Sequence, residues 1–180
     1  MEKARRRVLT SVPLAENTMP PSDDLDYRFM QQALTLARAA PLIGEVPIAA
    51  LLVRDGLVIA EAHNRRETQQ DPTAHAELMV IQAGAKQTKS WRLTGTTLYV
   101  TLEPCTMCIG AIVLARIPRL VFGATDPKAG ACGSIMNIPL EPRLNHRVEV
   151  IAGLCAEDSQ RLLQEFFREL RKDATRPENA

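Results

Sequence analysis

Apolar residues recur along the chain at two different spacings, which predict helices and strands in turn. Residues 27–40 show the three- and four-residue spacing of a helix, for which Asp26 is a candidate N-cap. Two apolar runs follow at 48–53 and 57–62, and Asp55-Gly56 between them is typical of a tight hairpin. The chain is therefore expected to begin with a helix and an antiparallel pair of strands.

The rest of the pattern alternates helices with strands. Asp71 and Pro72 are a capping residue and a first-turn proline that predict a helix over 72–85, and Pro104 predicts another to about residue 116. Further strands are expected at 96–102, 120–123 and 148–152, and an amphipathic helix at 156–172. Such alternation predicts an α/β fold: a three-layer α/β/α domain with a mixed central sheet of about five strands, opened by the hairpin.

Three segments lack this periodicity. Residues 125–145 contain several glycines and prolines, and a loop of that length is usually functional or disordered. Residues 1–25 include three consecutive arginines among Ser, Thr and Pro, which indicates a flexible extension. A disordered tail is expected at 173–180, which leaves the folded domain at 26–172.

Composition narrows the class of protein only in part. The chain has 180 residues, is 46% hydrophobic and carries a net charge of +1, so it has enough apolar material for one domain. A near-neutral charge neither supports nor excludes a nucleic-acid partner, and RNA contact would need a local basic patch. An apolar run long enough for a membrane span is absent from the sequence, as is a signal-peptide pattern, and a reducing cytoplasm is the expected location.

Two short motifs stand at the helix starts that proline marks. Glu77 follows His75 by two residues, and Cys108 follows Cys105 by three. Residues at positions i and i+3 share one helix face, so both sulfur atoms can reach one ion. The free N–H groups and the positive dipole end of a helix start stabilise thiolates, the form that binds zinc. His75, Cys105 and Cys108 are therefore candidate ligands of one Zn²⁺.

Three protein ligands leave one position of a tetrahedral zinc open, which is typical of catalytic sites. A water in that position becomes acidic, and Glu77 could carry its proton without being a ligand. The other cysteines and histidines, which belong to no ligand pair, are Cys132, Cys155, His63 and His146. Either of these histidines could in principle be a fourth ligand and close the site. Alone, the cysteine pair could be a redox motif or half of a structural zinc site, but the combination favours catalytic zinc.

With these motifs the sequence resembles the cytidine/deoxycytidylate deaminase superfamily, whose signature is His-x-Glu followed by Pro-Cys-x-x-Cys. It is more closely similar to the bacterial tRNA adenosine deaminase family, over residues 27 to about 171. Four stretches carry this similarity: GEVP at 44–47, DPTAHAE at 71–77, TLYVTLEPC at 97–105 and NHRVE at 145–149. Cytidine and guanine deaminases share the zinc triad but are not expected to carry the whole set.

The resemblance implies a reaction and its partners. Adenosine at the wobble position of a tRNA anticodon would be hydrolysed to inosine by zinc-bound hydroxide, with Glu77 as proton shuttle. One Zn²⁺ per subunit, a homodimer and the tRNA anticodon arm are implied, with no DNA or membrane partner. By position, Asn64 would orient the base and Asp126 would read the RNA backbone beside it. The pocket wall would include Ile48, Ala76 and Leu102, each of which is also an ordinary core residue.

Several alternatives stay open at this stage. The same zinc site would serve a small-molecule deaminase that acts on free cytosine, guanine or a nucleoside. A non-catalytic zinc module is a third possibility, against which the presence of Glu77 argues. Asn64 could instead be a turn residue at a strand end, and Asp126 a solvated loop carboxylate. Phe166 and Phe167 could stack on bases or pack with the leucines of their helix.

Overall fold

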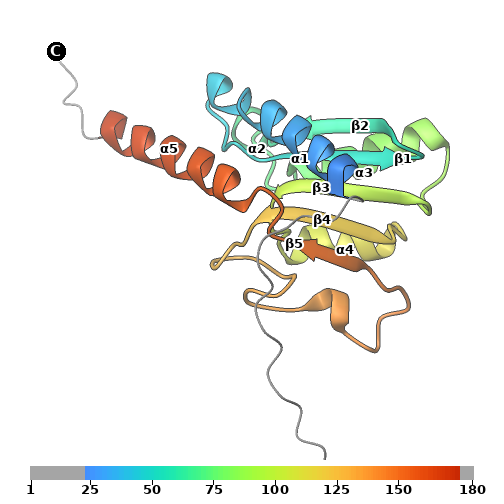
Figure 1. Ribbon diagram of the computed structural model, residues 1–180. Helices are drawn as coiled ribbons and strands as arrows, with labels where there is room; N and C mark the ends of the chain where they lie inside the picture. Colours follow the sequence, from blue (N-terminus) through green and yellow to red (C-terminus); the bar gives the residue numbers. More distant parts are fainter. Residues whose placement is uncertain (1–22, 175–180) are drawn as a thin grey trace, which may run out of the picture.

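A five-stranded mixed sheet forms the centre of the protein (Figure 1). The computed structural model describes residues 23–174, so the predicted extension and tail lie almost wholly outside the described residues. The strand order is β2-β1-β3-β4-β5. β1 is antiparallel to β2 and β3, whereas β4 and β5 continue parallel to β3. The strands are β1 (Ala49–Arg54), β2 (Leu57–His63), β3 (Thr96–Leu102), β4 (Arg119–Ala124) and β5 (Glu149–Ala152). The predicted mixed sheet is confirmed.

The hairpin between β1 and β2 forms where the sequence predicts it. Asp55 and Gly56 both adopt positive φ, at 51° and 74°. Positive φ at both central residues matches the twist of the flanking strands, which is why a dipeptide of this kind favours a two-residue turn. The turn fixes the start of the sheet and places β1 between β2 and β3.

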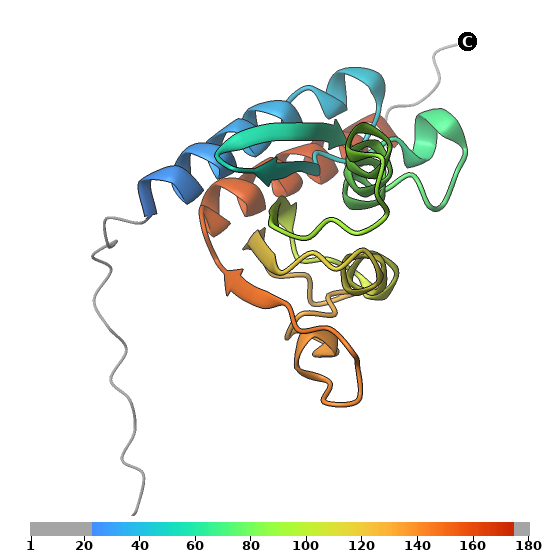
Figure 2. The ribbon, with the colours of Figure 1, turned by 90° about the vertical axis from the view of Figure 1, so that its right-hand side faces the viewer.

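Helices cover both faces of the sheet, which gives the three predicted layers (Figure 2). α1 (Asp23–Ala37) and α5 (Ala156–Ala174) lie on one face, where an apolar cluster includes Met30, Leu51 and Val121. α3 (Ala76–Thr88) and α4 (Thr106–Leu114) lie on the other face, over a larger cluster of buried aliphatic side chains. Burial of these two apolar surfaces provides the main driving force for the fold.

Asp26 does not cap the first helix, contrary to the sequence-based expectation. α1 begins at Asp23, so Asp26 lies within its first turn and faces the sheet. Its carboxylate accepts two hydrogen bonds from the Arg119 guanidinium, at 2.8 and 2.6 Å, and one from the Tyr99 hydroxyl at 2.6 Å. A charged bidentate partner is stronger than a neutral N–H group. Arg119 accordingly holds the pKa of Asp26 below its usual range.

The two helices that follow proline begin later than the sequence predicts. α3 begins at Ala76 rather than Pro72, because the Ala74 carbonyl accepts a hydrogen bond from the Arg65 N–H and keeps the preceding chain uncoiled. Asp71 caps a turn instead, accepting from both the N–H and the hydroxyl of Thr73 at 2.7 Å. α4 likewise begins at Thr106 and ends at Leu114, two residues before the expected end. His75 and Cys105 are therefore N-caps in extended conformation.

The long segment after β4 is ordered by contacts with the chain that precedes α4. It contains the 3-10 helix η2 (Ile138–Leu140) and pairs with Cys105 through a bridge at Gly130. Two further short helices precede α3: η1 (Ala40–Ile43) and α2 (Arg66–Gln69). Among the described residues, the helices are too short or too polar to cross a membrane.

Candidate metal centre and substrate pocket

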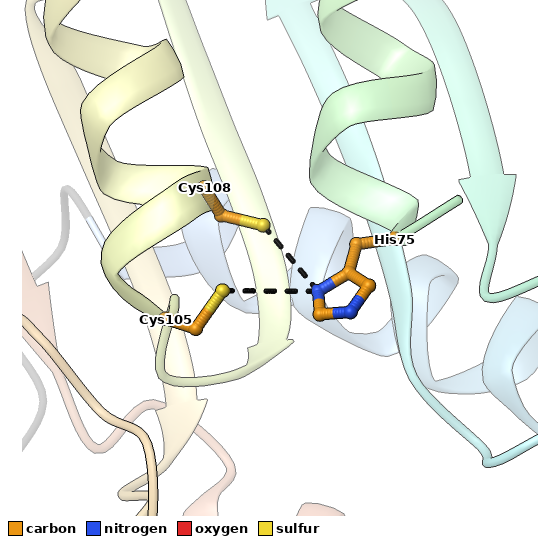
Figure 3. A group of neighbouring side chains, drawn as sticks. All are labelled: His75, Cys105 and Cys108. Atoms are coloured by element: carbon orange, nitrogen blue, oxygen red, sulfur yellow. Dashed lines mark hydrogen bonds between the residues drawn. The ribbon is translucent and has the colours of Figure 1, made fainter. Parts of the chain in front are cut away.

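The N-termini of α3 and α4 bring three candidate ligands together (Figure 3). His75 Nδ1 lies 3.8 Å from Cys105 Sγ and 3.5 Å from Cys108 Sγ, and all three ligand atoms lie within 4.8 Å of one another. A tetrahedral zinc with ordinary Zn–N and Zn–S bonds separates its nitrogen and sulfur ligands by about 3.5 Å. The spacing and the chemistry of this donor set therefore fit Zn²⁺.

The thiols of Cys105 and Cys108 shift each other's pKa in opposite directions. A hydrogen bond from Cys108 lowers the pKa of Cys105 to about 4, with a further contribution from His75. The same hydrogen bond, together with burial, raises the pKa of Cys108. A metal takes both sulfurs as thiolates, so its binding must displace a proton from this pair of thiols.

Glu77 lies in the first turn of α3 with only 4% of its surface exposed. It lines the same pocket as His75 and Cys105, as expected if the metal lies off the helix end. Burial raises the pKa of Glu77, and the charge of nearby Cys105 acts in the same direction. A buried carboxylate with a raised pKa is suited to accept and return a proton.

A cavity of about 710 Å³ opens over this centre. Its volume lies within the usual range for small-molecule sites, so it can take a nucleobase and part of its ribose. Four of the residues proposed from the sequence to contact the substrate line it: Ile48, Asn64, Leu102 and Asp126. Ala76 does not line the cavity; it is fully buried and packs in the core between α3 and the sheet.

The sequence matches the MafB19-like deaminase family over residues 25–171. It is 52% identical to a tRNA-specific adenosine deaminase of Bacillus subtilis (strain 168), over 82% of this chain and 91% of the relative. This protein belongs to the tRNA-specific adenosine deaminase family. A solved structure from a study of A-to-I editing by tRNA:A34 deaminases at the wobble position is 48% identical, with a TM-score of 0.73, over 76% of this chain and 99% of its own. A guanine deaminase structure from Bacillus subtilis is 30% identical, with a TM-score of 0.55, over 85% and 98% of the two chains.

In this deaminase, Asn64 is held by a carboxylate that the sequence analysis did not identify. Glu45 is fully buried and accepts a hydrogen bond of 3.1 Å from Asn64 Nδ2. It also accepts from the N–H and hydroxyl of Thr68, at 2.7 and 2.9 Å. Burial opposes the charge on Glu45, but these hydrogen bonds prevail and lower its pKa. The Asn64 amide is therefore fixed at the pocket wall.

Glu103 is the second carboxylate that the sequence analysis missed. Only 2% of its surface is exposed, and its partners belong to the long loop after β4. Burial acts against its charge, yet the hydrogen bonds from that loop lower the pKa of Glu103. The signal in the sequence was an acidic residue next to Pro104 at the end of an apolar strand, where a buried charge needs partners.

The aromatic pair of α5 divides between two environments. Phe167 is 41% exposed and lines the pocket, whereas Phe166 is half-buried. Their rings meet edge to face at 5.3 Å between centroids. Lys128, from the loop after β4, also lines the pocket. This side of the deaminase pocket thus combines an aromatic ring with a cationic side chain.

Proposed function

We propose that this deaminase is zinc-dependent and hydrolyses adenosine to inosine at the wobble position of a tRNA anticodon. The observation that carries the proposal is the buried Glu77 carboxylate beside the His75, Cys105 and Cys108 cluster, at one large pocket. The 52% identity to a tRNA-specific adenosine deaminase supports the choice of substrate.

His75 Nδ1 and the sulfur atoms of Cys105 and Cys108 would hold the zinc, which would make a water molecule in the pocket more acidic. Glu77 would accept one proton of that water, so that the water oxygen can add to the amine-bearing carbon of adenine. Glu77 would then deliver this proton to the adjacent ring nitrogen. It would take a second proton from the newly added hydroxyl as the carbonyl forms and pass it to the departing amine, which leaves as ammonia. The product is inosine, and the carboxylate returns to its starting charge.

The pocket rim supports a polynucleotide substrate. Lys128 and Arg66 line it from two different elements and bring basic groups toward phosphates, and the Arg66 guanidinium is also paired with the Glu67 carboxylate at 2.8 Å. Phe167 offers an exposed aromatic face on which an unstacked base can lie. Asn64 would orient the target base, and Asp126 would contact the ribose and backbone beside it.

A homodimer in the cytoplasm belongs to the same proposal. Large apolar side chains are exposed on α4 and on η2, which pack against each other: Leu114 is 71% exposed and Leu140 is 71% exposed. A second copy of the chain would cover them. The membrane and DNA are not expected as partners.

A small-molecule deaminase is the alternative that one observation favours. The similarity to a guanine deaminase structure extends over 85% of the chain, and the pocket volume suits a free base. The substrate decides between the two proposals. Purified protein is incubated separately with an anticodon stem-loop that carries wobble adenosine, and with free guanine, cytosine, adenosine and cytidine. Inosine in the RNA alone supports the first proposal, and conversion of free bases alone supports the second.

Zinc affinity should depend steeply on pH. A proton must leave the Cys105 and Cys108 pair when the metal binds, so a lower pH favours the form without zinc and raises the zinc dissociation constant. For each proton displaced, we expect the zinc dissociation constant to rise about tenfold for every unit by which the pH falls. Competition with a chromophoric chelator between about pH 6 and about pH 8 measures it. Cys155→Ser, in which the altered thiol lies outside the cluster, should show the same dependence. An affinity independent of pH would contradict the ligand assignment.

A further inference from the structure

One buried carboxylate collects four hydrogen bonds from the loop beside the pocket. Glu103 Oε1 accepts from the N–H groups of Cys132 and Ser134, at 2.9 and 3.1 Å. Glu103 Oε2 accepts from the N–H of Asp126 at 3.0 Å and from the Ser134 hydroxyl. The three donor residues span nine positions of the loop, so a single side chain holds both ends of this stretch.

The loop closes around this carboxylate without spare room. A Cβ atom at Gly130 would overlap the Glu103 carboxyl group and the Asp126 carbonyl, so glycine is required by close approach. The Gly130 N–H donates to the Asp126 carbonyl at 2.9 Å, and the Ala131 N–H donates to the Pro104 carbonyl at 2.9 Å. The loop is thus tied both to Glu103 and to the chain that leads into Cys105.

Of the three loop residues that Glu103 holds, Asp126 belongs to the stretch that lines the pocket. Residues 125–129 all belong to the pocket wall. The carboxylate of Asp126 accepts from the Lys128 N–H at 2.9 Å, while the backbone of Asp126 is held by Glu103. Glu103 lines the pocket too, but its oxygens are occupied by the loop.

We propose that Glu103 is a positioning residue that places Asp126 and Lys128 against the RNA substrate. The role rests on the proposed function, since Asp126 and Lys128 are taken to contact the strand beside the target base. Glu103 acts through Asp126, on substrate affinity rather than on the deamination step.

A glutamine at position 103 should release Asp126 in particular. With its NH₂ group at the Oε1 position, glutamine would place a donor against two backbone N–H donors, those of Cys132 and Ser134. With the NH₂ group at the Oε2 position, only the Asp126 N–H would face another donor, because the Ser134 hydroxyl can rotate and accept from the amide. The second arrangement costs less, and it leaves the Asp126 N–H without its acceptor.

The kinetic test compares KM with kcat on the anticodon stem-loop. We expect Glu103→Gln to raise KM about tenfold, because the variant loses one hydrogen bond to a charged group. The value of kcat should stay within about threefold of the wild type, and the zinc content should not change. Asp126→Ala should raise KM similarly, and the double variant should be no worse than Asp126→Ala alone. Glu141→Gln makes the same chemical change in the same long segment, at a carboxylate bound to Arg143, and should leave KM unchanged.

Hydrogen exchange separates the positioning role from the identity of the substrate. In the zinc-loaded protein without RNA, Glu103→Gln should speed exchange of the Asp126 amide and leave the amides of Cys132 and Ser134 slow. Unchanged exchange at Asp126, additive effects in the double variant, or a fall in kcat with KM constant would overturn the proposal. A wild type that leaves the stem-loop unmodified would reject the proposed function instead, without altering the exchange result.

Discussion

Replacing Glu77 with glutamine is expected to reduce turnover of the stem-loop by at least about a thousandfold. The substitution preserves the shape of the side chain but removes its ability to accept a proton. The carboxylate is 4% exposed and contributes to the pocket, so solvent cannot readily take over its role. Single-turnover formation of inosine measures the loss.

Zinc should remain bound in Glu77→Gln, because Glu77 is not part of the His75, Cys105 and Cys108 cluster. Metal content by mass spectrometry or atomic absorption checks this directly. Glu61→Gln makes the matched change at an exposed carboxylate on β2 and should retain full activity. Retained turnover in Glu77→Gln would show that another group carries the proton, and loss of zinc would show that Glu77 supports the metal.

Asp26→Ala should have the largest effect on stability, lowering the free energy of unfolding by about 2 kcal/mol. It leaves the Arg119 guanidinium and the buried Tyr99 hydroxyl without their acceptor. Loss of one partner from a fully buried ion pair costs about 3–5 kcal/mol, and the Arg119 side chain is 25% exposed, which reduces the penalty. Denaturant unfolding of the zinc-loaded protein gives the value.

The loss of unfolding free energy in Asp26→Ala should also depend on pH. The folded-state pKa of Asp26 is lower than its unfolded value, so its stabilising contribution is complete above the unfolded pKa of about 4. It declines as pH falls through the lower folded pKa, and the difference between wild type and Asp26→Ala should shrink there. Glu149→Ala removes a second carboxylate near Arg119, at 3.8 Å and 67% exposed, and should change stability little. Equal losses in the two variants would contradict the account.

Local sequence signals predicted most of the fold, and they failed where a distant partner intervened. Asp55-Gly56 specified its own turn, because positive φ is a property of those two residues. Asp26 was expected to cap a helix, but Arg119, 93 positions away, is its partner. The start of α3 was misplaced because the Arg65 N–H binds the Ala74 carbonyl, a contact that no spacing rule contains.

The same distinction holds at the site. The candidate metal ligands and Glu77 lie within short motifs at two helix starts, and the structure brings the ligand atoms of His75, Cys105 and Cys108 together. Short motifs did not predict the roles of Glu45 and Glu103, because their hydrogen-bond partners lie 19 to 31 residues further along the chain. The resemblance implies that Ala76 belongs to the pocket wall, and the structure places its fully buried side chain in the apolar core beneath α3.

Deamination of the adenosine at the wobble position of a tRNA is the central claim, and an assay on a full tRNA tests it most directly. Purified, zinc-loaded protein is incubated with a tRNA that carries adenosine at the wobble position, and with a matched tRNA in which that adenosine is exchanged with a neighbouring anticodon base. Inosine is then read as a change from A to G on reverse transcription and sequencing. The account predicts near-complete conversion at the wobble position and none in the matched tRNA. Equal conversion in both, or none in either alongside turnover of free guanine, would contradict it.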